Sequence, residues 1–269
     1  MSPRQLAKQF AIAAAYPILR VFAGRPPKKI SAMLRVKNEI EFLERSIKSV
    51  VDSVDELVVV DNLSTDGSAD VIANLSKLHP DKIRAYNYPH EMARYGEEME
   101  KLAAMPNGMK SPSFLPNFYN WCADKCTCPY ILKWDGDTIA TKALAPTLDR
   151  FRHSNKQALW HTGVNLHADR ASFIAGRPFE DMEPRLFYKR FSTYNNYLGY
   201  CEALWSPYVF NYPSFIEKEF EPLYFHMKWC KIDRYSNMSN NLQISHAALS
   251  GRGAPLPEYL REQVNSLGL

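Results

Sequence analysis

Short apolar runs alternate with longer stretches of helical spacing in the first half of the chain. Residues 29–36 and 57–60 are apolar runs bounded by turn residues, which predicts two strands. The run at residues 57–60 (LVVV) is apolar at every position, as in a strand buried on both faces of a sheet. Between the two runs, apolar residues recur from Ile40 to Val54 at the spacing of an amphipathic helix.

The same order of elements continues along the chain. A second helix, with apolar residues between Val71 and Leu78, is expected to follow an N-cap at Ser64 or Thr65. Residues 83–86 (IRAY) are expected to form a third short strand. Strands that alternate with helices at this spacing predict βαβ units and a mostly parallel sheet, and therefore an α/β fold class.

The second half of the chain has a weaker pattern. Residues 91–116 are rich in Glu, Met, Lys and Pro, and we expect either a mobile functional loop or a helix with a loop. Further elements are expected as follows: helices at residues 118–126, 143–151 and 257–264, and strands at residues 130–132, 158–160 and 185–188. We divide the chain into an N-terminal helix and linker (1–28), a first half (29–142), a second half (143–250) and a tail helix (251–269).

Two carboxylates follow the apolar run at residues 130–132. Asp135 and Asp137 flank Gly136, which lets the backbone bend so that both side chains can turn toward one point. Convergent carboxylates suit a hard divalent ion that carries a substrate phosphate as a further ligand. An ordinary Asp-Gly surface turn is the alternative interpretation.

Polar residues at two other strand ends favour a site over a turn. Arg35, Asn38 and Glu39 lie at the end of the first predicted strand, and Asp61 lies at the end of the second. In an open parallel sheet, ligands bind beyond the carboxyl ends of the strands. All three strand ends are therefore expected to face one crevice.

Composition limits the function classes. The chain has 269 residues, of which 46% are hydrophobic and 23% charged, with a net charge of +4. This charge is too small and too dispersed to indicate a nucleic-acid partner, but it is compatible with a phosphorylated ligand. Five cysteines indicate no disulfide framework, and the cluster at Cys122, Cys126 and Cys128 lacks the second pair typical of a zinc site.

The N-terminal segment has three open interpretations. Its apolar stretch from Phe10 to Phe22 is too short and too interrupted to span a membrane, and basic residues flank it on both sides. This pattern fits a helix lying on an anionic membrane surface, an ordinary packed helix, or an export signal.

Three motifs in order resemble the nucleotide-binding half of family 2 glycosyltransferases with the GT-A fold. They are MLRVKNE, in which a strand ends in Lys-Asn-Glu; VVVDNLSTDGS, in which a strand ends in aspartate; and WDGD, the Asp-x-Asp motif. The resemblance covers about residues 30–142. Asn62 and Leu63 depart from it, because many members have a second acidic or small residue and then glycine there.

The resemblance implies a role for each matching residue. Asp61 would hydrogen-bond the nucleobase, with uracil expected, and Arg35, Asn38 and Glu39 would lie near the base and ribose. Asp135 would lie near the ribose and the metal. Asp137 would ligate Mn²⁺ or Mg²⁺ bridging the diphosphate.

The second half supplies weaker candidates. His226 and Lys228 resemble the late His-x-Lys of many GT-A enzymes, where the histidine completes the metal shell and the lysine faces the diphosphate. Inversion by direct displacement needs a carboxylate base for the acceptor hydroxyl. Asp181 or Glu180 is our candidate, with Glu202 in reserve, although a solvated acidic loop explains the first two equally well.

The sequence therefore predicts a metal-dependent GT-A glycosyltransferase with a mixed acceptor-side half. Its partners would be a nucleotide-sugar donor and a glycan or lipid-linked saccharide acceptor, as in polysaccharide biosynthesis. We expect a cytoplasmic protein, in contact with the inner membrane face if the basic segment binds lipid. The alternatives are a sugar nucleotidyltransferase, against which the absence of a glycine-rich phosphate loop argues, and an inactive nucleotide- or glycan-binding module.

Overall fold

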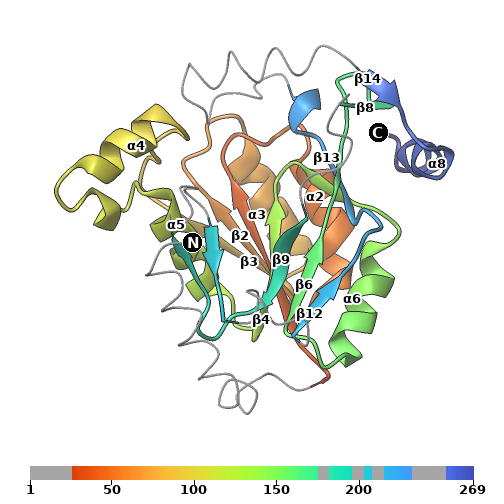
Figure 1. Ribbon diagram of the computed structural model, residues 1–269. Coiled ribbons are helices and arrows are strands. Elements are labelled where there is room, and N and C mark those ends of the chain that lie inside the picture. The colour runs from red at the N-terminus through yellow and green to blue at the C-terminus, as the bar shows by residue number, and fades with distance from the viewer. Residues whose placement is uncertain (1–25, 175–181, 196–202, 208–214, 232–252) are drawn as a thin grey trace.

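The computed structural model describes residues 26–174, 182–195, 203–207, 215–231 and 253–269 (Figure 1). Its centre is a seven-stranded sheet in the order β12-β6-β9-β4-β1-β2-β3. The strands are β1 (Ile30–Val36), β2 (Glu56–Asp61), β3 (Ile83–Asn87), β4 (Tyr130–Asp135), β6 (Ala158–His161), β9 (Glu183–Tyr188) and β12 (Ile216–Lys218).

The central sheet is mostly parallel. Strands β3, β2, β1 and β4 are paired in parallel, as are β6 and β12, whereas β9 runs antiparallel to both β4 and β6. The predicted α/β class, with a mixed second half, is confirmed. Strand β2 is buried at all of its positions, as the LVVV run predicted.

Helices cover both faces of the central sheet (Figure 1). Helices α2 (Leu43–Val50), α3 (Ser68–Leu78) and α6 (Leu144–His153) share one apolar cluster with alternate residues of β1, β2 and β4. Helix α5 (Leu115–Lys125) packs with the intervening residues of the same strands in a second cluster. This two-sided burial is the reason why the strands are apolar at nearly every position.

Three smaller sheets lie beside the central one. The sheet β5-β13-β7 joins β5 (Thr138–Ala140), β13 (Tyr224–His226) and β7 (Val164–Asn165), and it packs with α8 (Glu258–Leu267) in a third apolar cluster. The other two are pairs: β10 (Thr193–Asn195) with β11 (Ala203–Trp205), and β8 (Ser172–Ile174) with β14 (Gly253–Pro255).

The predicted N-cap at Ser64 or Thr65 was wrong. Helix α3 begins at Ser68, its N-cap residue is Gly67, and no side chain caps it. The Ser64 hydroxyl instead accepts a hydrogen bond from the amide of Asn38 (2.9 Å), and the Ser68 hydroxyl accepts one from the amide of Glu39 (2.9 Å). These hydroxyls therefore bind backbone amides of the loop after β1 and do not cap the start of helix α3.

The remaining predicted elements have mixed outcomes. Residues 91–116 contain a helix and a loop, with α4 at Glu97–Ala104 and a 3₁₀ turn at Gly108–Lys110. The predicted tail helix is present as α8. The N-terminal segment and the base candidates Asp181, Glu180 and Glu202 lie outside the described residues. No helix in the described ranges is long and apolar enough to cross a membrane.

The clustered cysteines are core residues. Cys122, Cys126 and Cys128 are buried as free thiols, and Cys122 and Cys126 pack in the cluster beneath α5. Burial raises the pKa of the Cys126 thiol to about 12, so it stays protonated at neutral pH. Within the described part of the chain, no three His, Cys, Asp or Glu side chains are grouped as a metal site.

Candidate active site

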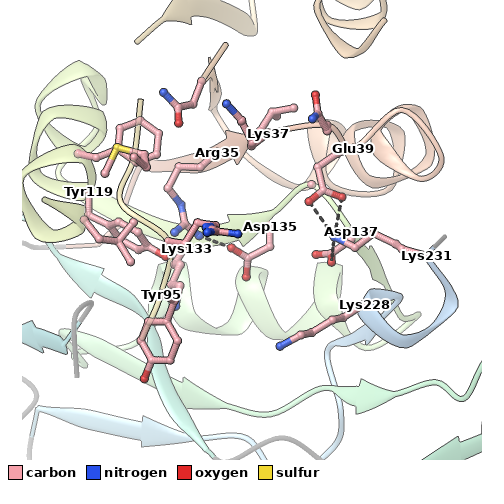
Figure 2. A pocket seen from close by; sticks show the side chains of 18 of the residues that line it. Arg35, Lys37, Glu39, Tyr95, Tyr119, Lys133, Asp135, Asp137, Lys228 and Lys231 are labelled. Atoms are coloured by element: carbon pink, nitrogen blue, oxygen red, sulfur yellow. Dashed lines mark hydrogen bonds and ion pairs between the residues drawn. The ribbon is translucent and has the colours of Figure 1, made fainter. Parts of the chain in front are cut away.

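A cavity of about 750 Å³ lies at the carboxyl ends of β1 and β4 (Figure 2). Its volume is in the range of small-molecule and cofactor sites. Seven of the predicted nucleotide and metal residues line it: Arg35, Asn38, Glu39, Asp135, Asp137, His226 and Lys228. The eighth, Asp61, ends β2, and its neighbour Asn62 lines the cavity. The expectation that three strand ends face one crevice is confirmed.

Strand register brings these residues together. Arg35 of β1 lies directly opposite Asp135 of β4 in the parallel ladder. Strand β13 runs antiparallel to β5, so that His226 pairs with Thr138, immediately after Asp137. The amide of Met227 donates a 2.8 Å hydrogen bond to the carbonyl of Asp137. A segment some ninety residues later in the sequence (226 against 137) thereby flanks the aspartate pair.

Asp135 is held between two guanidinium groups. Arg35 donates to Oδ1, and Nη1 of Arg185 on β9 donates to Oδ2 at 2.9 Å. Burial pushes the pKa of Asp135 upward, but the charges of Arg35, Arg185 and Lys133 outweigh burial and hold the pKa below its usual value. The Arg35 guanidinium also lies 3.8 Å from the centre of the Tyr119 ring.

Asp137 has different partners. The ammonium of Lys231 is 2.8 Å from Oδ2, and Nε2 of His226 is 3.4 Å from Oδ1. Burial raises the pKa of Asp137, yet the nearby Lys231 and His226 more than offset it and hold the pKa well below the usual value. Both partners come from residues 224–231, outside the central sheet.

Glu39 lies on the same side of the cavity as Asp137. Its two oxygens are 2.9 and 3.0 Å from the ammonium of Lys231. Burial and then the charge of Asp137 raise the pKa of Glu39 to about 8, against the opposing effect of Lys231. The resemblance implies that Glu39 lies near the base and the ribose. In the structure, Glu39 lies beside Asp137, the proposed metal ligand.

The chain turns at Gly136 and Asp137, as predicted, but the glycine is needed for the space around it and not for a positive φ. Its φ is not in the positive region, so no left-handed bend occurs there. A Cβ at this position would instead lie 2.9 Å from Cγ of Glu39. The glycine permits the close approach of Glu39 to the aspartate turn.

Asp61 presents a buried oxygen without a partner. Its Oδ2 accepts a 3.2 Å hydrogen bond from the amide of Ser64, whereas its buried Oδ1 has no hydrogen-bond partner among the residues that the structure describes. A buried acceptor left unpaired is costly unless a ligand or water satisfies it. Beside it, the Asn62 amide donates to the carbonyls of Tyr88 (3.1 Å) and His90 (2.7 Å), which fixes the chain leading to the cavity wall.

Apolar and aromatic side chains form one wall of the cavity. Met92, Leu115, Phe118 and Tyr119 line it, the last three from α5. Such a wall suits the flat face of a base or a sugar. Lys37, which pairs with Glu91 at 3.2 Å, lies at the more exposed edge.

The predicted site residues did not include five cationic side chains that line the cavity: Lys37, Arg94, Lys133, Arg185 and Lys231. Lys133 and Arg185 lie in buried strands, and a charged side chain inside an apolar run is a signal that could have identified both. Lys231 gave no such signal, because it follows a short 3₁₀ turn at Lys228–Cys230 and its partners are distant in sequence. Figure 2 shows its ammonium between Glu39 and Asp137.

The residues present fit a divalent ion that is completed by its substrate. Asp137 Oδ1 and His226 Nε2 are 3.4 Å apart, close enough to occupy neighbouring positions around one ion. Mg²⁺ is often held by only one or two protein ligands, with substrate phosphates and water as the rest. Asp135, predicted as a further ligand, has both oxygens occupied by arginines.

Parts of the chain are similar to known proteins. Residues 31–93 match the model of the family described as "Glycosyl transferase family 2". The mannosyltransferase PcManGT of Pyrobaculum calidifontis, in complex with GDP-Man and Mn²⁺, is similar over 97% of this chain and 78% of its own, at 12% identity and TM-score 0.46.

A second solved structure is similar over a shorter region. Glucosyl-3-phosphoglycerate synthase of Mycobacterium tuberculosis, in complex with Mn²⁺, UDP and phosphoglyceric acid, matches 49% of this chain at 22% identity and TM-score 0.29. This chain spans 42% of that synthase's length. No curated protein matches the sequence.

The polar cavity at the parallel strand ends of the α/β sheet and the family match over residues 31–93 together support a glycosyltransferase. The family match covers the ends of β1 and β2 and stops before the aspartate pair, so the roles of Asp135 and Asp137 belong to the proposal that follows.

Proposed function

We propose that the protein transfers a sugar from a nucleotide-diphospho-sugar, with uracil as the expected base, to a glycan or lipid-linked saccharide. The observation that carries this proposal is the convergence of seven predicted donor-site residues on one cavity. They come from elements that are far apart in the sequence, and a surface turn at the aspartates would not bring them together.

The base-binding role falls to the end of β2. The unpaired Oδ1 of Asp61 is an acceptor that suits a ring N–H, such as N3–H of uracil. The wall formed by Leu115, Phe118 and Tyr119 would pack against the base or ribose. Arg35, held by Tyr119 and Asp135, is a positioned donor at the same edge of the sheet.

The diphosphate-binding role falls to the cations at the other end of the cavity. Breaking the sugar–phosphate bond develops negative charge on the leaving diphosphate, and cations already in position stabilise that charge. Lys228 lines the cavity for this purpose, together with Lys133. A divalent ion held by Asp137 and His226 would supply further Lewis-acid stabilisation.

The acceptor hydroxyl needs a carboxylate base if the reaction inverts the anomeric centre. Asp181 and Glu180 stay our candidates for it, and the described residue Glu183, two positions after Asp181, lines the cavity at the start of β9. The anomeric configuration of the first product, followed by proton NMR, tests inversion. A product that keeps the configuration of the donor would exclude this direct displacement.

A thermal-shift panel tests the donor class. We expect one of UDP, GDP, CDP and dTDP to raise the melting temperature of the wild type by several degrees, and more with Mn²⁺, because ligands that bind only the native state stabilise it. Asp137→Ala should abolish the gain that Mn²⁺ adds. No shift with any nucleotide would contradict the proposal.

Donor hydrolysis separates an enzyme from a binding module. Free sugar released slowly from the bound donor without an acceptor is expected of a transferase, whereas nucleotide binding with no release on any donor would favour an inactive module. Release of nucleoside monophosphate instead would point to cleavage within the diphosphate.

We further propose that the protein works in the cytoplasm at an anionic membrane face. The basic residues that flank the apolar stretch Phe10–Phe22 support this proposal. Arg4→Glu combined with Lys8→Glu should reduce co-sedimentation with phosphatidylserine vesicles several-fold. Equal co-sedimentation of the wild type and the double variant would contradict this proposal.

A further inference from the structure

One lysine occupies the position beside Asp137 where a cation is needed. The ammonium of Lys231 is 2.8 Å from Oδ2 of Asp137 and 2.9 and 3.0 Å from the two oxygens of Glu39. All three side chains are largely buried, with exposed fractions of 12% for Lys231, 7% for Asp137 and 9% for Glu39. The two carboxylates thus share one buried positive charge (Figure 2).

The shared charge has a clear physical cause. Two carboxyl groups confined at this depth repel each other when both are ionised, and a cation between them relieves the repulsion. Lys231 supplies that cation from within the chain. A divalent ion bound to Asp137 and His226 would supply a larger charge at almost the same place.

We propose that Lys231 is a built-in competitor for the metal, and that its ammonium and a divalent ion exclude each other at Asp137. The proposal rests on the proposed function, since it takes Asp137 and His226 as the metal ligands. In the nucleotide-free protein, Lys231 neutralises Asp137. When the metal binds, Lys231 withdraws to Glu39, which already holds it through both oxygens.

Competition of this kind couples metal binding to donor binding. An ion that enters alone must displace an ammonium that is already paired, so its affinity for the free protein is low. A nucleoside diphosphate brings its own negative charges, which bind the ion as further ligands and offset the repulsion from Lys231. The metal is therefore retained when its substrate is present and released when it is not.

The test is direct binding of Mn²⁺, followed by the loss of the free-ion signal in electron paramagnetic resonance, without nucleotide and then with UDP. Lys231→Met is expected to tighten Mn²⁺ binding to the nucleotide-free protein at least about tenfold, because it removes the competing charge at contact distance. It should also reduce the factor by which UDP improves Mn²⁺ binding.

Lys37→Met is the matched control. It removes one positive charge from the lining of the same cavity, but from a lysine that pairs with Glu91. We expect it to change the affinity for Mn²⁺ less than about twofold. Equal gains in both variants would mean that only the net charge of the cavity matters, which would overturn direct competition.

Other outcomes separate this inference from the proposed function. Unchanged or weaker Mn²⁺ binding by Lys231→Met overturns the competition while leaving the metal role of Asp137 intact. Lack of Mn²⁺ binding by the wild type, even with UDP, overturns the metal role itself. Should Lys231→Met not fold, tight Mn²⁺ binding by the nucleotide-free wild type, with no gain from UDP, is the result that overturns the competition.

Discussion

The two aspartates of one short motif lie in different surroundings. Asp135 contacts Arg35 and Arg185, which come from β1 and β9 of the central sheet. Asp137 contacts His226 and Lys231, which come from the end of β13 and the turn after it. Residues only two positions apart are therefore held by separate parts of the fold.

The difference indicates that the two aspartates have different roles. The arginines of Asp135 are fixed by strand pairing. Removing their shared carboxylate would take an ion-pair partner from the buried Arg35, whereas Arg185 would keep the more exposed Glu183 at 3.4 Å. The lysine of Asp137 keeps a second carboxyl group, Glu39, as a hydrogen-bond partner, so that Asp137 can exchange its cation while the ammonium of Lys231 stays bonded. We infer that Asp135 serves the architecture of the site and Asp137 its chemistry.

The largest expected effect is on stability at Asp135. Asp135→Asn should lower the free energy of unfolding by about 3 kcal/mol, because breaking a buried ion pair leaves an uncompensated charge. Asp137→Asn should cost about 1–2 kcal/mol, since Lys231 keeps Glu39. Urea denaturation of the three proteins measures both differences.

Asp52 offers a control for the loss of a carboxylate as such. It is exposed and lies 3.6 Å from Lys82, so Asp52→Asn should change the stability by less than about 1 kcal/mol. If Asp135→Asn and Asp137→Asn lower the free energy of unfolding by the same amount, the inferred difference in role between the two aspartates is wrong.

The same contrast explains how much of the site the sequence revealed. The end of a buried strand can be recognised in the sequence, because an apolar run such as residues 57–60 stops abruptly at a polar residue. Parallel pairing then brings such ends to one edge of the sheet. Arg35, Asp61 and Asp135 were predictable for this reason. Asp137 followed from its spacing to Asp135 across Gly136, and the family resemblance added His226.

The partners that distinguish the aspartates were not predictable in this way. Arg185 reaches Asp135 only because β9 inserts antiparallel beside β4, a pairing that no local pattern specifies. Lys231 reaches Asp137 only because β13 pairs with β5 in a separate small sheet. Both contacts depend on tertiary arrangement between segments that are fifty or more residues apart.

A smaller effect is expected at Gly136. Gly136→Ala places a methyl group 2.9 Å from Cγ of Glu39, and overpacking of this kind costs about 1–3 kcal/mol. Glu39→Gly removes both Cγ and Cβ, the latter at 3.1 Å from the added methyl group, so Gly136→Ala should cost less than about 0.5 kcal/mol in that background, because the two positions then no longer touch. Equal costs in both backgrounds, measured by urea denaturation, would show that Glu39 is not the reason for the glycine.

The smallest expected effect is on stability at Lys28, a second buried lysine that differs from Lys231 in its partners. The ammonium of Lys28 donates to the carbonyls of Phe151 (2.7 Å) and Ser154 (2.6 Å) instead of carboxylates. Burial lowers the pKa of Lys28 to about 8, against the raising effect of Glu217, whereas the carboxylates around Lys231 outweigh burial and raise its pKa.

The shifted pKa of Lys28 predicts a pH dependence of stability. Between the folded pKa of about 8 and the unfolded value of 10.5, the unfolded chain binds the proton that the folded protein has lost. The contribution of Lys28 to the free energy of unfolding therefore rises with pH across this window. Urea denaturation of the wild type and of Lys28→Met at pH 7.5, 9 and 10 measures it, because the difference between the two proteins removes the titration of all other groups. If the stability of the wild type relative to Lys28→Met falls with rising pH, carbonyl oxygens stabilise the charged form of a buried lysine as carboxylates do. The contrast between Lys28 and Lys231 would then be wrong.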